Sequence, residues 1–180
     1  MSKFCEWNEY LKRITNQKSL NEYFVNFMIL WMAYNHYYNS LIEIEPELFS
    51  TRDEKKKDSE KAIVIYKKED LNLFYEQNKD EILRDFQNIP AFRGLGIRNS
   101  VIDTRFNDIS SDRNAYFNEN ANDLKHFLKA VYQIRCNLFH GDKTPYESTD
   151  KALVVWAYKY LLLILHRLEP CLFTEYNANS

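Results

Sequence analysis

Residues Leu124 to Gly141 read LKHFLKAVYQIRCNLFHG, and the spacing of their apolar side chains decides the fold class. These side chains recur at steps of three and four, which puts them on one face of a helix. The apolar positions are Leu124, Phe127, Leu128, Val131, Ile134, Leu138 and Phe139. Gly141 closes the segment, because a glycine just past the last turn adopts the left-handed conformation that ends a helix. The pattern therefore predicts an amphipathic helix that ends beside His140.

Arg135 stands on this apolar face, where the spacing calls for an apolar side chain. It follows Val131 by four residues and precedes Leu138 by three. A guanidinium group keeps its charge, so against a core it needs a carboxylate, a phosphate or carbonyl partners. Two interpretations stay open. Arg135 and His140 form a catalytic or RNA-contacting pair, or Arg135 is a structural ion-pair partner and His140 a cap of the helix C-terminus.

The rest of the chain has helical spacing as well. Apolar and aromatic side chains recur at steps of three and four from Leu20 to Leu41, and residues 62–86 continue this spacing as one broken helix or two. A further helix is expected from about Thr149 to Leu168, after a TPYE sequence at 144–147 that has the form of a capping box. The short connection implies that the last two helices pack antiparallel.

Two segments lack this spacing. Residues from about 44 to 60 contain a mixed charge run, which predicts a solvated loop or an exposed helix start. Residues 87–120 are polar and rich in turn formers, and we expect a loop or insertion there. No segment alternates as a strand does. The prediction is therefore one all-α domain over residues 1–180, a helical bundle with a loop-rich middle segment.

The amino-acid composition limits which cellular compartment and which binding partners we expect for this protein. The three cysteines of the 180-residue chain have neither paired nor metal-type spacing, which indicates a reducing compartment and predicts no metal site. One very apolar segment is too short to span a membrane and another contains Lys159, so we expect a cytoplasmic protein without membrane contact. The net charge of −2 does not indicate a nucleic-acid binder, so any RNA contact must come from local groups.

The stretch YQIRCNLFHGDKTP at 132–145, followed by an apolar helix, resembles the signature of the HEPN superfamily. That signature is Arg, four to six residues, then His, at the end of a helix in a small all-α bundle. The stretch NFMILWMAYNHYYNSL at 26–41 is similar to the aromatic, Asn-containing helix that comes early in many such proteins. The resemblance covers both ends of the chain and implies a HEPN-like helical domain.

The resemblance also implies an activity. Many members are metal-independent endoribonucleases, often toxins or antiviral defence effectors, whose Arg and His act in a cleft between two copies of the domain. Arg135 and His140 are accordingly the catalytic candidates, with no metal or cofactor. Many active members have a polar residue directly after the Arg, where this chain has Cys136, so Asn137 is a candidate auxiliary residue. The implied partners are RNA, a second copy of the chain, and an antitoxin or nucleotidyltransferase.

The chemistry of RNA cleavage suits this residue pair. RNA supplies its own nucleophile, the 2′-hydroxyl, so the protein needs a base, an acid and positive charge near the phosphorus. His140 can transfer the protons and Arg135 can hold two phosphate oxygens. The first hypothesis is therefore an endoribonuclease. Two alternatives remain, a non-catalytic RNA-binding or nucleotide-binding domain of HEPN type, and a helical interaction module regulated by a partner subunit.

Overall fold

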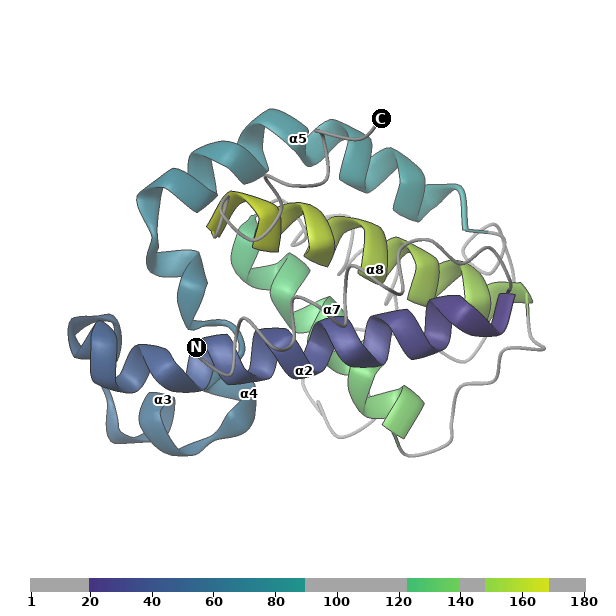
Figure 1. The fold of residues 1–180 in the computed structure, drawn as a ribbon. Helices are drawn as coiled ribbons and strands as arrows, with labels where there is room; N and C mark the ends of the chain where they lie inside the picture. Colours follow the sequence, from purple (N-terminus) through teal and green to yellow (C-terminus); the bar gives the residue numbers. More distant parts are fainter. Residues whose placement is uncertain (1–19, 90–122, 140–147, 169–180) are drawn as a thin grey trace, which may run out of the picture.

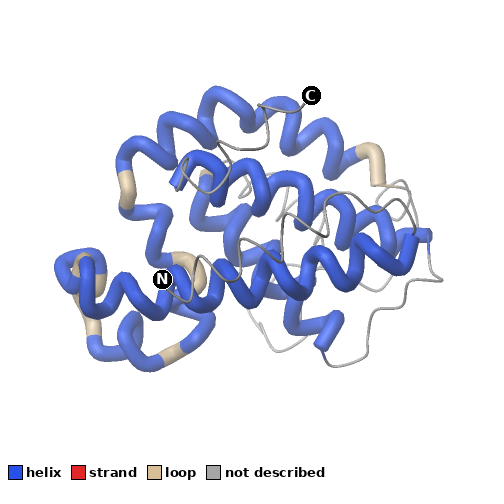
Figure 2. The backbone as a smooth tube through the Cα atoms, viewed as in Figure 1, coloured by secondary structure: helices blue, strands red, loops and turns tan. Residues whose placement is uncertain are grey.

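The computed structural model describes residues 20–89, 123–139 and 148–168. Every regular element in these ranges is helical, and none of them is a strand (Figure 2). The elements are α2 (Leu20–Ile44), η1 (Pro46–Leu48), α3 (Arg52–Lys56), α4 (Asp58–Lys61), η2 (Val64–Lys67), α5 (Glu69–Gln87), α7 (Leu124–Phe139) and α8 (Ser148–Leu168), where η marks a 3-10 helix. The all-α prediction is therefore confirmed for the part of the chain that the structure describes.

Helix α8 is the central element of the described bundle. It lies between α2 and α5, and α7 crosses it obliquely (Figure 1). Apolar side chains surround most of its circumference, which is typical of a helix that other helices cover. Leu153, Val154 and Leu161 have no exposed surface. The indole N–H of Trp156 donates a hydrogen bond of 3.1 Å to the carbonyl of Ile82, which links α8 to α5.

Helix α2 packs along α8 with the aromatic face that its spacing predicts. The buried members of this face are Phe24, Phe27, Trp31, Tyr34 and Tyr38. Tyr23, which shares the spacing, is 36% exposed and meets the ring of Tyr158 edge-on at 6.2 Å, so it lies at the margin of the contact with α8. The opposite side of α2 is also apolar, and Val25 and Met32 are exposed there.

Residues 62–86 contain two helical pieces rather than one. The chain leaves the helical conformation at Lys68, between η2 and α5. The Lys68 ammonium group lies 2.6 Å from both carboxylate oxygens of Glu45, directly after α2. This contact ties the junction to the end of α2.

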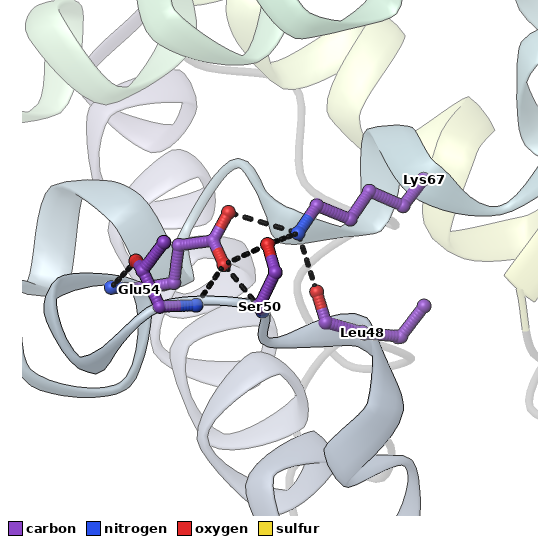
Figure 3. Close-up of polar contacts among 5 residues, drawn as sticks. Leu48, Ser50, Glu54 and Lys67 are labelled. Carbon is purple, nitrogen blue, oxygen red and sulfur yellow. Dashed lines mark hydrogen bonds and ion pairs between the residues drawn. The ribbon is translucent and has the colours of Figure 1, made fainter.

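The predicted loop at 44–60 contains the short helices η1 and α3 and the start of α4. Thr51 caps α3, because its hydroxyl accepts from the Glu54 N–H at 3.1 Å while the Glu54 carboxylate accepts from the Thr51 N–H at 2.9 Å. The Lys67 ammonium group donates to Glu54 at 2.8 Å and to the carbonyl of Leu48 at 2.6 Å (Figure 3). Lys67 is the main reason that the pKa of Glu54 falls to about 2.

Helix α7 carries the apolar seam on which Arg135 lies. Leu124, Leu128 and Val131 are fully buried on it, and the chain directions of α7 and α8 are broadly opposed (Figure 1). His140, Gly141 and the TPYE sequence lie outside the described residues, as does most of the predicted loop at 87–120. The predicted C-terminal cap and capping box therefore stay predictions.

Candidate functional site

Arg135 lies near the end of α7, half-buried among three aromatic rings. Its guanidinium carbon is 4.5 Å from the ring centroid of Phe139, 5.7 Å from that of Trp31 and 5.9 Å from that of Tyr132. The rings come from α2 and α7. A guanidinium group over the faces of aromatic rings is stabilised by their π-electrons without giving up its hydrogen-bond donors. The rings can therefore hold the charge of Arg135 at the edge of the core.

Within the described residues, this guanidinium group has few polar contacts. Nη1 lies 3.8 Å from the sulfur of Cys136, a long contact to a weak acceptor. Nε is buried and has no hydrogen-bond partner in the described part of the chain. None of the described carboxylates forms an ion pair with Arg135. The plainer interpretation, in which Arg135 forms a structural ion pair, therefore has no carboxylate to support it within the described ranges.

A second unpartnered donor belongs to the neighbouring Trp31. This side chain is 2% exposed, and its indole Nε1 is buried without a hydrogen-bond partner among the residues that the structure describes. A buried N–H that lacks an acceptor costs about 1–3 kcal/mol. The two N–H donors, one on Trp31 and one on Arg135, therefore oppose folding. An unsatisfied buried donor in a folded protein calls for an explanation, and a role in binding or catalysis is one such explanation.

Helix α4 contributes a carboxylate, Asp58, that side chains from α2 and α7 both contact. The Tyr38 hydroxyl donates to Asp58 Oδ1 at 2.8 Å, and the Tyr132 hydroxyl donates to Oδ2 at 3.5 Å. The side-chain amide of Asn35 donates to Oδ1 at 3.4 Å and also to the Tyr38 hydroxyl. Asp58 therefore has donors at both of its oxygens.

Asp58 and Arg135 act in opposite directions on the pKa values of Tyr38 and Tyr132. Burial raises the pKa of Tyr38 well above its usual range, and the hydrogen bond to Asp58 raises it further. Burial also raises the pKa of Tyr132, with Asp58 adding to the effect. Arg135 acts in the opposite sense on both pKa values. Each hydroxyl therefore feels a carboxylate and a guanidinium group together.

The polar cluster continues along α2 toward α4. Asn39 donates from its side-chain amide to the carbonyl of Asn35 at 2.8 Å, and Lys61 donates to the Asn39 side chain at 2.7 Å. The stretch 26–41 that contains Asn35 and Asn39 stands out in the sequence, but the sequence predicts no role for either of them or for Lys61. Asp58 lies within a mixed charge run, and such runs are usually solvated. The spacing of four between the asparagines at 35 and 39 was the only signal in the sequence for a polar cluster here, and it does not identify Asp58 as the partner carboxylate.

Asn137 and His140 differ in how far the structure describes them. The side-chain oxygen of Asn137 accepts a hydrogen bond of 2.6 Å from the buried Gln133, one turn earlier on α7. Asn137 is therefore engaged within its own helix. His140 lies outside the described residues, so the geometry of the candidate pair is known only for Arg135.

The described residues contain no group of three or more His, Cys, Asp or Glu side chains that could hold a metal ion. None of the described helices combines the length and the apolar character needed to cross a membrane. No family model, curated protein or solved structure was found to match this chain.

Proposed function

We propose that the protein is a HEPN-type endoribonuclease in which Arg135 binds the scissile phosphate and His140 transfers protons. The observation that carries this proposal is the guanidinium group of Arg135, which is held by aromatic rings and unpaired with any described carboxylate. A guanidinium group in this state keeps donors for phosphate oxygens. The resemblance of residues 132–145 to the HEPN signature supports the assignment of His140.

The reaction needs only groups that RNA and these two residues supply. The 2′-oxygen of the ribose attacks the adjacent phosphorus as a base takes its proton. The bond from phosphorus to the 5′-oxygen breaks as an acid protonates that oxygen. The products are a 2′,3′-cyclic phosphate and a 5′-hydroxyl. Arg135 stabilises the negative charge that builds up on the phosphate oxygens, and a histidine can act as the base or the acid near neutral pH.

A two-fold dimer is part of the proposal, because one chain supplies only one arginine and one histidine. The exposed apolar side chains on α2 and near Arg135 favour it. Val25 is 53% exposed, Met32 44% and Phe139 46%. Exposed apolar side chains that form one patch often mark an interface, and a second copy of the chain is the partner proposed here. A dimer is expected in light scattering at micromolar concentration, and a monomer there would contradict this part of the proposal.

The wider role is proposed from the resemblance alone. A toxin or antiviral defence effector must be restrained in its own cell, so an antitoxin or nucleotidyltransferase partner belongs to the hypothesis. Co-purification of the native protein from its own cells would identify such a partner.

The test is RNA cleavage in the presence of EDTA. His140→Ala should lower the cleavage rate by about a hundredfold to ten-thousandfold, the usual cost of losing a positioned acid or base. His126→Ala is the matched control, since His126 lies at the other end of α7 beside Asp123. Arg135→Lys should also lose activity, because lysine keeps the charge but lacks the two-pronged guanidinium geometry. Arg84→Lys, on an exposed part of α5, should keep it.

One observation favours a second candidate function, RNA binding without cleavage. Cys136 stands directly after Arg135, and the side chain of Asn137 already accepts from Gln133. Binding that depends on Arg135, with no cleavage of single-stranded or structured RNA, would favour this candidate. Cleavage that requires magnesium would contradict the proposed mechanism, and a protein that neither binds nor cleaves RNA would favour the helical interaction module.

A further inference from the structure

Asp58 and Arg135 both contact the Tyr132 side chain and do not form an ion pair with each other. Asp58 contacts the hydroxyl groups of Tyr38 and Tyr132, and Arg135 lies 5.9 Å from the Tyr132 ring centroid. Coulomb attraction in half-buried surroundings is stronger than in water, so it favours a direct pair between the Asp58 carboxylate and the Arg135 guanidinium group. The other contacts of Asp58 oppose such a pair.

The hydrogen bonds of Asp58 provide the restraint. Tyr38 and Asn35 donate to Oδ1, and Tyr132 donates to Oδ2, so all three donors come from α2 and α7 and both carboxylate oxygens accept. Hydrogen bonds to an ionised acceptor are among the stronger ones in proteins. The Tyr38 hydroxyl is the shortest of these contacts, at 2.8 Å, and Tyr38 itself has no exposed surface. The donor that holds Asp58 most closely is therefore fixed in the core.

We propose that Tyr38 and Tyr132 are positioning residues that hold the Asp58 carboxylate away from Arg135 and so keep the guanidinium group open to a phosphate. The restraint follows from the contacts alone, whereas the identity of the ligand as an RNA phosphate rests on the proposed function. Asp58 then competes with the ligand for the guanidinium group of Arg135. Without the two hydroxyl groups, it pairs with Arg135 and closes the site.

Substitution by phenylalanine removes the restraint and leaves the packing. The Tyr38 ring meets the Trp31 and Tyr34 rings edge-on at 6.2 and 5.1 Å, contacts that a phenylalanine ring also makes. Tyr160→Phe is a matched control, because the Tyr160 hydroxyl donates to Asp85 at 2.6 Å, between α8 and α5. Both changes remove one hydroxyl from a carboxylate. Only the first touches the Arg135 site.

The first experiment observes Arg135 directly and needs no RNA. Arginine Nε–H groups give a ¹⁵N–¹H correlation spectrum, and Arg135→Lys identifies the resonance of Arg135 by removing it. Tyr38→Phe, alone and with Tyr132→Phe, is expected to shift this resonance, and adding Asp58→Asn is expected to return it toward its wild-type position. Tyr160→Phe should leave it in place. A resonance that Tyr38→Phe with Tyr132→Phe does not move, or that Asp58→Asn does not restore, overturns the inference.

The second experiment measures affinity for a fluorescent 2′-O-methyl RNA, which lacks the nucleophilic hydroxyl and stays intact. Tyr38→Phe should weaken binding about tenfold if the ion-paired form comes to dominate, and Asp58→Asn in the same chain should restore it. Asp58→Asn alone should tighten binding, because a negative charge leaves the phosphate site. Weaker binding by Asp58→Asn would overturn the inference. If the wild-type protein binds no RNA while the resonance shifts and returns as described, the proposed function fails and the positioning role stands.

Discussion

The contact between Glu54 and Lys67 predicts a specific loss of stability in acid. Four donors converge on the Glu54 carboxylate, namely the Lys67 ammonium group, the Ser50 hydroxyl and the N–H groups of Ser50 and Thr51 (Figure 3). Together they hold the pKa of Glu54 at about 2, against a usual 4.5, with Lys67 as the largest cause. The folded protein therefore stabilises the ionised carboxylate, and Glu54→Gln removes that charge at constant shape.

The magnitude follows from the pKa difference and from exposure. The difference between 4.5 and about 2 is roughly 2.5, and at about 1.36 kcal/mol for each pKa unit it corresponds to about 3.4 kcal/mol. The Glu54 and Lys67 side chains are 17% and 22% exposed, so solvent screens the pair in part. We expect Glu54→Gln to lower the free energy of unfolding by about 1–2 kcal/mol at pH 7.

The pH dependence has a definite sign. Because the pKa of Glu54 is lower in the folded state, its contribution is complete above the unfolded value of about 4.5. It disappears as the pH falls toward the folded value of about 2. Urea unfolding followed by circular dichroism at pH 7, 4 and 2.5 should show wild type and Glu54→Gln converging in acid. The exposed Glu43 supplies a control in Glu43→Gln. A gap between wild type and Glu54→Gln that is absent at pH 7, or equally wide at pH 2.5, would refute the reasoning.

Three further predictions concern the core and the site. Phe127→Ala should lower the free energy of unfolding by about 3–5 kcal/mol in urea titrations, because Phe127 is fully buried with its ring 5.7 and 5.2 Å from those of Tyr75 and Trp156. Trp156→Phe should cost about 1–3 kcal/mol in the same assay, since it loses the hydrogen bond to Ile82 and part of a buried ring. Arg135→Met should leave the thermal midpoint unchanged or raise it while abolishing RNA binding in a fluorescence assay, because an apolar side chain removes the unpartnered Nε donor. A large drop in the midpoint would indicate that Arg135 serves stability.

The helices and their buried faces were largely predictable from local spacing. The period of 3.6 residues is a property of each helix by itself, so the apolar pattern identified α2, α7 and α8 without knowledge of their neighbours. The aromatic face of α2 is buried as its spacing predicts, except at Tyr23. That exception has a tertiary cause, because the width of the buried face depends on where α8 lies.

The breaks between helices were less predictable, because distant contacts accompany them. The sequence left open whether residues 62–86 form one broken helix or two, and the structure places a junction at Lys68, whose ammonium group contacts Glu45. The charge run near residue 54 was equally compatible with a loop or a helix start. The Thr51 capping box is local, but the Lys67 contact that completes it comes from η2.

Arg135 can be recognised as unusual without a structure, since a charge on an apolar seam violates a local pattern of the helix. Tertiary packing alone decided what surrounds it. Trp31 reaches the guanidinium group from α2, and Asp58 comes from a short helix in a charge run, so both are distant from Arg135 in the chain. Neighbours of this kind follow from how whole helices cross, and helix crossing is set by the packing of many side chains at once.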